Sequence, residues 1–282
     1  VAGLSSRRGG PRRRRMTAKV KSGWGRSHMM NIIQTEPELA VGLGLIGLMW
    51  LCGLGADIRR RNRARKCPTR SPFGHWALTA TLLWSLCAVS VWAWLGSGRS
   101  LEALGFRWGD GWGVLLAWAI ALAFLGLQLA QLPVIRRDPA VQANLRSVMF
   151  ASGDYDALMP RRRQDCWGFY LVGVTAGITE EVIFRAFLIS VLALLMPLWL
   201  AALAAVAAFL LAHLYQGPQG LVRILPVTLV MTLTYILSGS IWPGIIIHVA
   251  VDVLAGLIVW LILPDEGYVS PEGELAEGGL PA

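Results

Sequence analysis

The sequence predicts an all-α, polytopic transmembrane helical bundle of seven or eight spans. Hydrophobic residues make up 55% of the 282 residues and charged residues only 15%, whereas soluble domains are about 45–50% apolar and about 25% charged. The Lys and Arg residues behind the net charge of +9 lie mostly in short clusters between apolar stretches. Cytoplasmic loops of membrane proteins have this arrangement. The charge pattern therefore argues against a nucleic-acid-binding protein.

Seven apolar stretches are near or above the length of about 17–25 residues that a helix needs to cross a bilayer. They cover residues 39–56, 76–95, 112–135, 167–195, 198–215, 221–238 and 243–263. The first, third and fifth connections between them contain most of the Lys and Arg residues, which predicts that these connections are cytoplasmic. The C-terminus is then inside and the N-terminus outside.

The chain divides into four segments. Residues 1–38 form a basic tail, 39–165 the first three spans with a cytoplasmic loop, 166–263 a polar-cored bundle, and 264–282 an acidic tail. Both tails are predicted to be disordered, because they are polar or rich in glycine. An Arg-rich tail contradicts an outside N-terminus. We therefore expect that part of residues 1–28 is absent from the natural product, or that an eighth span exists.

Three charged residues interrupt the fourth apolar stretch, namely Glu180, Glu181 and Arg185. A charged side chain in the middle of a bilayer costs at least about 2.5–3.5 kcal/mol on insertion scales, so an acidic pair there is a functional-site hypothesis by default. Helical residues are about 100° apart, which places Arg185 within about 40° of Glu181. We interpret Glu181 and Arg185 as a structural ion pair and Glu180 as the carboxylate available for chemistry.

Three further polar residues lie in the later spans, namely His213, His248 and Asp252. The turn at Met196-Pro197 is 16 residues after Glu180 and 16 before His213, so both lie about 24 Å from it in an antiparallel hairpin. His248 follows the Gly239–Gly244 connection too closely to reach that depth from a surface turn. We therefore expect this connection to dip into the protein.

Two kinds of chemistry suit these residues, and both lead to amide hydrolysis. Glu180 or an imidazole can deprotonate a water molecule while a second donor stabilises the oxyanion. Alternatively, Glu180, His213, His248 and Asp252 can bind zinc, which activates the water. The opposing hypothesis is a non-catalytic membrane scaffold or immunity factor with a polar helix-packing core. A transporter lacks support, because the sequence has no internal repeat.

Three motifs in order, Glu180-Glu181-x-x-x-Arg185, Phe209-x-x-x-His213 and His248-x-x-x-Asp252, resemble those of the CPBP family of intramembrane proteases. This family includes CAAX prenyl proteases, bacteriocin-processing proteins and abortive-infection proteins. The resemblance covers about residues 166–263. Ala186 stands where the family often has glycine, and Asp252 stands where eukaryotic CAAX proteases have asparagine.

The resemblance implies an intramembrane endopeptidase in which Glu180, Glu181, His213, His248 and Asp252 are catalytic and Arg185 and Phe209 support them. Glu180 would activate water together with His213, and His248 and Asp252 would bind the oxyanion. Zinc and metal-free mechanisms are both described for the family, and Asp252 favours a metal. The implied partners are membrane lipid and a protein or peptide substrate with an apolar or lipidated segment. The implied location is a bacterial plasma membrane, with the active site open to the cytoplasm.

Overall fold

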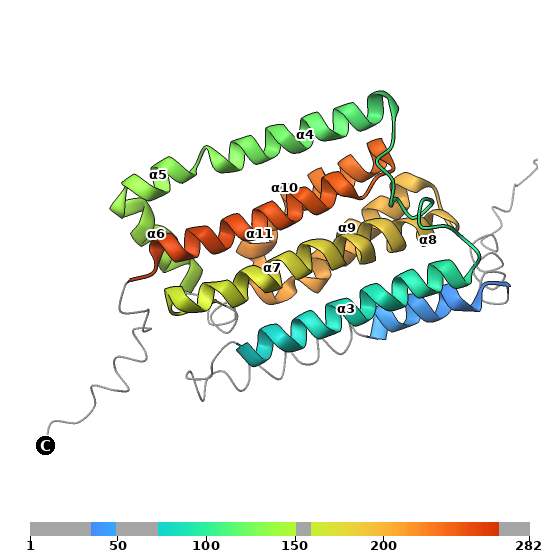
Figure 1. Ribbon diagram of the computed structural model, residues 1–282, viewed down its shortest axis with the longest axis horizontal. Coiled ribbons are helices and arrows are strands. Elements are labelled where there is room, and N and C mark those ends of the chain that lie inside the picture. Colours follow the sequence, from blue (N-terminus) through green and yellow to red (C-terminus); the bar gives the residue numbers. More distant parts are fainter. Residues whose placement is uncertain (1–34, 49–72, 151–158, 265–282) are drawn as a thin grey trace, which may run out of the picture.

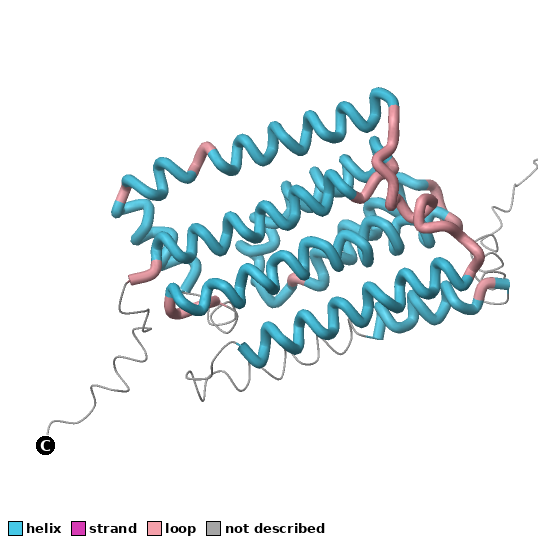
Figure 2. The backbone as a smooth tube through the Cα atoms, in the orientation of Figure 1, coloured by secondary structure: helices cyan, strands magenta, loops and turns pink. Residues whose placement is uncertain are grey.

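A computed structural model describes residues 35–48, 73–150 and 159–264, which are mainly helical, with turns and a loop at 97–110, and contain no strand (Figure 2). The all-helical fold is therefore confirmed for this part of the chain. The elements are Pro37–Leu48, α3 (Phe73–Gly96), α4 (Gly111–Leu129), α5 (Leu132–Arg137), α6 (Pro139–Phe150), η1 (Arg163–Asp165), α7 (Cys166–Glu180), η2 (Glu181–Leu188), α8 (Ile189–Ala193), α9 (Leu198–Ala212), η3 (Leu214–Gln216), α10 (Gly217–Ser238) and α11 (Trp242–Ile262).

Four helical segments among the described residues are long and apolar enough to cross a membrane. They are Phe73–Gly96, Gly111–Arg137, Leu214–Ser238 and Trp242–Ile262. The predicted count of seven or eight spans is not confirmed, because Pro37–Leu48 and α9 are shorter apolar helices and α7 continues into a different helical form. The predicted disordered tails lie outside the described residues, apart from 35–38 and 264, as do the end of the first span and most of the first basic connection.

The long helices lie side by side, with their axes roughly aligned (Figure 1). Helix α11 packs against α7, α10 and α4, while α7 also packs against α3. The two helices that carry the acidic pair and His248 are therefore neighbours inside the bundle. Apolar side chains such as Leu122 and Trp112 remain exposed on α4, as expected for a helix that faces lipid.

Two glycines let α7 and α11 approach closely. A Cβ atom at Gly177 would lie 2.6 Å from Cγ2 and 2.7 Å from the backbone nitrogen of Val249, and one at Gly173 would lie 3.0 Å from Cβ of Asp252. Small residues four apart are a common means of close helix packing in membranes. In this protein, Gly173 and Gly177 let the face of α11 that carries Asp252 pack directly on α7.

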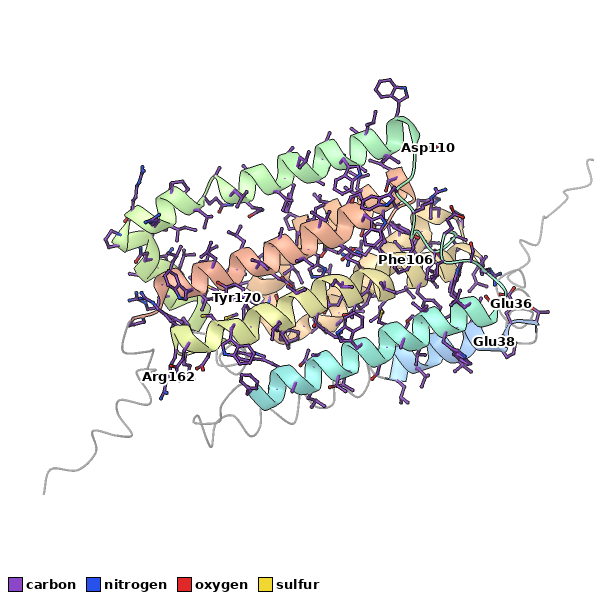
Figure 3. All side chains as sticks on the ribbon, in the orientation of Figure 1. Glu36, Glu38, Phe106, Asp110, Arg162 and Tyr170 are labelled. Atoms are coloured by element: carbon purple, nitrogen blue, oxygen red, sulfur yellow. The ribbon has the colours of Figure 1, made fainter. Side chains whose placement is uncertain are left out.

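The loop of residues 97–110 covers the connection between α10 and α11. Ile241 donates its backbone N–H to the Gly105 carbonyl over 2.9 Å, and Arg107 Nε donates to the Gly239 carbonyl over 3.1 Å. Ser240 and Ile241 are buried. The connection thus lies inside the protein, as predicted from the position of His248, and the labelled Phe106 and Asp110 mark the covering loop (Figure 3).

An ion pair joins the helix Pro37–Leu48 to the end of α3, where Glu36 and Glu38 lie (Figure 3). Arg99 Nη2 donates to Glu36 Oε1 over 2.9 Å, and the Arg99 guanidinium lies over the Trp94 ring. The hydrogen bond to Glu36 raises the pKa of Arg99 above its ordinary value. Because the pair is partly exposed, its contribution to stability is about 1 kcal/mol or less.

We expect Gly113→Ala to destabilise the protein by about 1–3 kcal/mol, the usual effect of overpacking. A Cβ atom at Gly113 would overlap the Leu237 carbonyl oxygen and push α4 away from α10. Gly126→Ala is the matched control, because a Cβ atom there meets nothing within 4 Å. Thermal denaturation in detergent measures the difference, and equal midpoints for the two variants would contradict the close packing of α4 on α10.

Candidate active site

The acidic pair lies where the helix changes form. Glu180 is the last residue of α7, and Glu181 begins η2, a π-helical segment in which all eight residues are buried. A π-helix has i→i+5 hydrogen bonds, and it is rare outside single-turn bulges, which occur frequently at functional sites. Regular α-helical spacing does not predict this change. Arg185 nevertheless lies beside Glu181.

Glu181 is fully buried and binds two partners through one oxygen. Its Oε1 accepts a hydrogen bond from Arg185 Nη1 over 2.7 Å and lies 2.8 Å from His248 Nδ1. The predicted ion pair of Glu181 and Arg185 is therefore confirmed. The bond to His248 was not predicted, although it joins η2 directly to α11.

Phe209 is a platform for Arg185 and His213. The Arg185 guanidinium carbon lies 4.3 Å from the Phe209 ring centroid, and the His213 ring stacks on Phe209 with 4.3 Å between centroids. The Phe209 carbonyl oxygen is also 2.8 Å from His213 Nδ1. The spacing of four residues between Phe209 and His213 thus sets both the plane and the rotation of the imidazole.

These contacts leave the same nitrogen of each imidazole available. A carbonyl oxygen can only accept, so His213 Nδ1 carries a hydrogen, and an ionised Glu181 imposes the same tautomer on His248. Nε2 of each neutral ring is then an unprotonated acceptor. The two Nε2 atoms lie 3.7 Å (His213) and 3.9 Å (His248) from Oε2 of Glu180.

Glu180 Oε2 is buried and has no hydrogen-bond partner among the described residues. Its distances to the two imidazoles exceed direct hydrogen-bond length, and at such distances water molecules commonly bridge polar groups in proteins. Asp252 Oδ2 lies 3.8 Å from His248 Nε2, and its side chain is 30% exposed against 12% for Glu180. Asp252 therefore forms the outer rim of the cluster.

The structure brings together the residues that the sequence analysis selected, and their catalytic roles stay predictions. They are Glu180, Glu181, Arg185, Phe209, His213, His248 and Asp252. Sequence reasoning missed the two glycines that bring α11 against α7. Their Gly173-x-x-x-Gly177 spacing was a visible signal for this packing.

The polar atoms of the predicted zinc ligands are somewhat farther apart than the ligand atoms of an ideal tetrahedral zinc site. Ligand atoms around tetrahedral zinc, at about 2.0–2.1 Å from the ion, are about 3.3–3.4 Å apart, whereas Glu180 Oε2 is 3.7 Å from His213 Nε2 and 3.9 Å from His248 Nε2. Among the described residues, no group of three or more His, Cys, Asp or Glu side chains is arranged to hold a metal ion. The set Glu180, His213, His248 and Asp252 remains a prediction.

We expect Arg185→Leu to lower the free energy of unfolding by about 3–5 kcal/mol, because it leaves the buried Glu181 carboxylate without its cation. The matched control is Arg99→Leu, which breaks the partly exposed pair with Glu36 and should change stability by about 1 kcal/mol or less. Denaturant titration in detergent measures both changes. Similar losses of unfolding free energy in the two variants would show that the buried Glu181–Arg185 pair is no more important for stability than the partly exposed Glu36–Arg99 pair.

Comparison with known proteins concerns the part of the chain that contains this cluster. Residues 162–254 match the family model of Rce1-like proteins, described as type II CAAX prenyl endopeptidase Rce1-like. The match covers about a third of the chain and contains every residue of the cluster from Glu180 to Asp252. No curated protein and no solved structure matches the chain. Residues 162–254 are therefore similar to the Rce1-like CAAX prenyl endopeptidase family, in agreement with the resemblance seen in the three motifs.

Proposed function

We propose that this protein is an intramembrane endopeptidase that hydrolyses a peptide bond in a membrane-associated protein or peptide. The observation that carries the proposal is the convergence of Glu180 Oε2 with Nε2 of His213 and His248, within 3.7–3.9 Å, in the buried part of the bundle. The match of residues 162–254 to a peptidase family supports the same reaction class. The neighbouring Glu181 differs, because its Oε1 is hydrogen-bonded to both Arg185 and His248 and so holds the scaffold together.

Water activation begins at Glu180. A water molecule held between Glu180 Oε2 and His213 Nε2 gives a proton to the carboxylate as its oxygen attacks the carbonyl carbon of the substrate. The attack forms a carbon–oxygen bond and a tetrahedral oxyanion. Glu180 then passes the proton to the amide nitrogen, the carbon–nitrogen bond breaks, and a carboxyl and an amine product leave.

His248 and Asp252 complete this reaction centre. In its doubly protonated form, His248 donates Nε2–H to the developing oxyanion while Nδ1–H remains bound to Glu181. Asp252 Oδ2, 3.8 Å from the same Nε2, supplies negative charge beside that cation at the exposed rim. Phe184 and Phe209 border the cluster and exclude bulk water, which strengthens these charge interactions.

The proposals for the substrate and the orientation rest on the lipid-facing surface of the bundle and on the arginines near the start of α7. Because the bundle faces lipid, we propose that the substrate carries an apolar or lipidated segment that keeps its scissile bond at the membrane. The start of α7 lies near Arg162 (Figure 3), and Arg136, Arg137 and Arg146 lie on the neighbouring α5 and α6. The positive-inside rule supports a cytoplasmic position for this end in a plasma membrane.

We expect Glu180→Gln and His213→Ala each to lower kcat by about 10²-fold or more, the usual contribution of general acid–base catalysis. Cleavage of quenched fluorescent peptides, with and without a prenyl group, in proteoliposomes measures the loss. Glu102→Gln is the control, because Glu102 is an exposed acid in the 97–110 loop. Wild-type cleavage by both site variants would end the protease proposal. Impaired folding or partner binding, with no proteolysis to lose, would favour the scaffold hypothesis.

We expect purified protein to retain its activity after chelation, because the proposed proton transfers use Glu180 and the imidazoles directly. Elemental analysis before and after chelator treatment, with cleavage measured on the same samples, tests this expectation. Loss of activity on chelation and its return with zinc would instead assign Glu180, His213, His248 and Asp252 as metal ligands.

A further inference from the structure

We infer that Gly244 is a positioning residue that keeps His248 in its reactive orientation by leaving room for the Glu181 carboxylate. The inference rests on the proposed function, and it assigns Gly244 a role that none of the three motifs contains. Gly244 is buried in the first turn of α11. It lies four residues before His248, so both residues are on the same face of the helix.

The space beside Gly244 is occupied by one side chain. A Cβ atom at this position would lie 2.8 Å from Oε2, 3.6 Å from Cδ and 3.9 Å from Cγ of Glu181, and these are its three nearest atoms. A distance of 2.8 Å is shorter than carbon–oxygen van der Waals contact. Any side chain at position 244 therefore acts first on the Glu181 carboxylate.

Glu181 cannot move away without breaking its other bonds. Its Oε1 holds both Arg185 and His248, while Oε2, the atom that faces Gly244, has no hydrogen-bond partner among the described residues. The side chain is fully buried, so solvent cannot replace the lost partners. A displaced carboxylate releases His248 Nδ1, and the imidazole then loses its fixed tautomer and rotation.

The first test compares three glycine variants by kinetics. Gly244→Ala should lower kcat by about 10²-fold, as a misplacement of about 1 Å can do, and leave KM within about twofold. Gly126→Ala, which meets nothing within 4 Å, should behave as wild type. Gly177→Ala places a Cβ atom against the Val249 backbone. It should lower the melting midpoint and shows what a general packing defect does to kcat. Wild-type kcat in a folded Gly244→Ala variant would overturn the inference.

The second test is rescue by a shorter acid. Glu181→Asp withdraws the carboxylate by one methylene and makes room for a Cβ atom at position 244. The double variant should therefore have a kcat at least about tenfold above the product of the two single effects, as expected for coupled neighbours. Simple additivity would contradict direct contact. If the single variant Gly244→Ala does not fold, the double variant should still be purified as folded protein. A double variant that also fails to fold overturns the inference.

The third test needs no enzymatic activity. Nitrogen NMR of protein labelled at its 4 histidines reports which ring nitrogen carries hydrogen. His248 should be protonated at Nδ1 in the wild type and lose this state in Gly244→Ala, whereas His213, held by the Phe209 carbonyl, should not change. An unchanged His248 signal overturns the inference. A changed signal in a protein whose wild type cleaves no substrate would contradict only the proposed function.

Discussion

The arrangement of the cluster depends on one carboxylate oxygen, Oε1 of Glu181, which Arg185 and His248 share. A buried charge carries a desolvation penalty of several kcal/mol unless it is paired and hydrogen-bonded. The position of α11 beside α7 and η2 satisfies this requirement through His248. The close contacts at Gly173 and Gly177 allow that position, and hydrogen bonds from the 97–110 loop hold the connection that leads into α11.

The two adjacent glutamates differ because their neighbours differ. Glu181 bonds the scaffold through Oε1, whereas Glu180 Oε2 faces two imidazole nitrogens at longer distances. Both histidines are held through Nδ1, by the Phe209 carbonyl and by Glu181 respectively. The nitrogens that point to Glu180 are therefore the ones that the scaffold does not use. The hydrogen bonds at Nδ1 therefore fix the orientation of both imidazoles, and Nε2 of each neutral ring remains an acceptor.

Much of this site could be predicted from the sequence, because charged and polar residues are rare in apolar spans. The equal spacing of Glu180 and His213 from Met196-Pro197 predicted a common depth, and their polar atoms are 3.7 Å apart. The i+4 spacing predicted the Glu181–Arg185 pair. The π-helical segment was missed because spacing arguments assume one helical form. The Glu181–His248 bond was missed because it depends on the tertiary position of α11. The predicted span count is not confirmed, because α9 is one of the shorter apolar helices among the described residues.

Glu180 and Glu181 each have one buried oxygen without a partner among the described residues, and the difference between these oxygens argues for chemistry at Glu180. An unmade hydrogen bond in a buried site costs about 1–3 kcal/mol, and more for a charged group. Oε2 of Glu181 faces the glycine at position 244, where no donor side chain can reach it, and Arg185 compensates its charge through Oε1. Oε2 of Glu180 faces two nitrogens that accept in their neutral form. A water molecule can donate to the carboxylate and to one imidazole at once, which is the arrangement that the proposed activation of water requires.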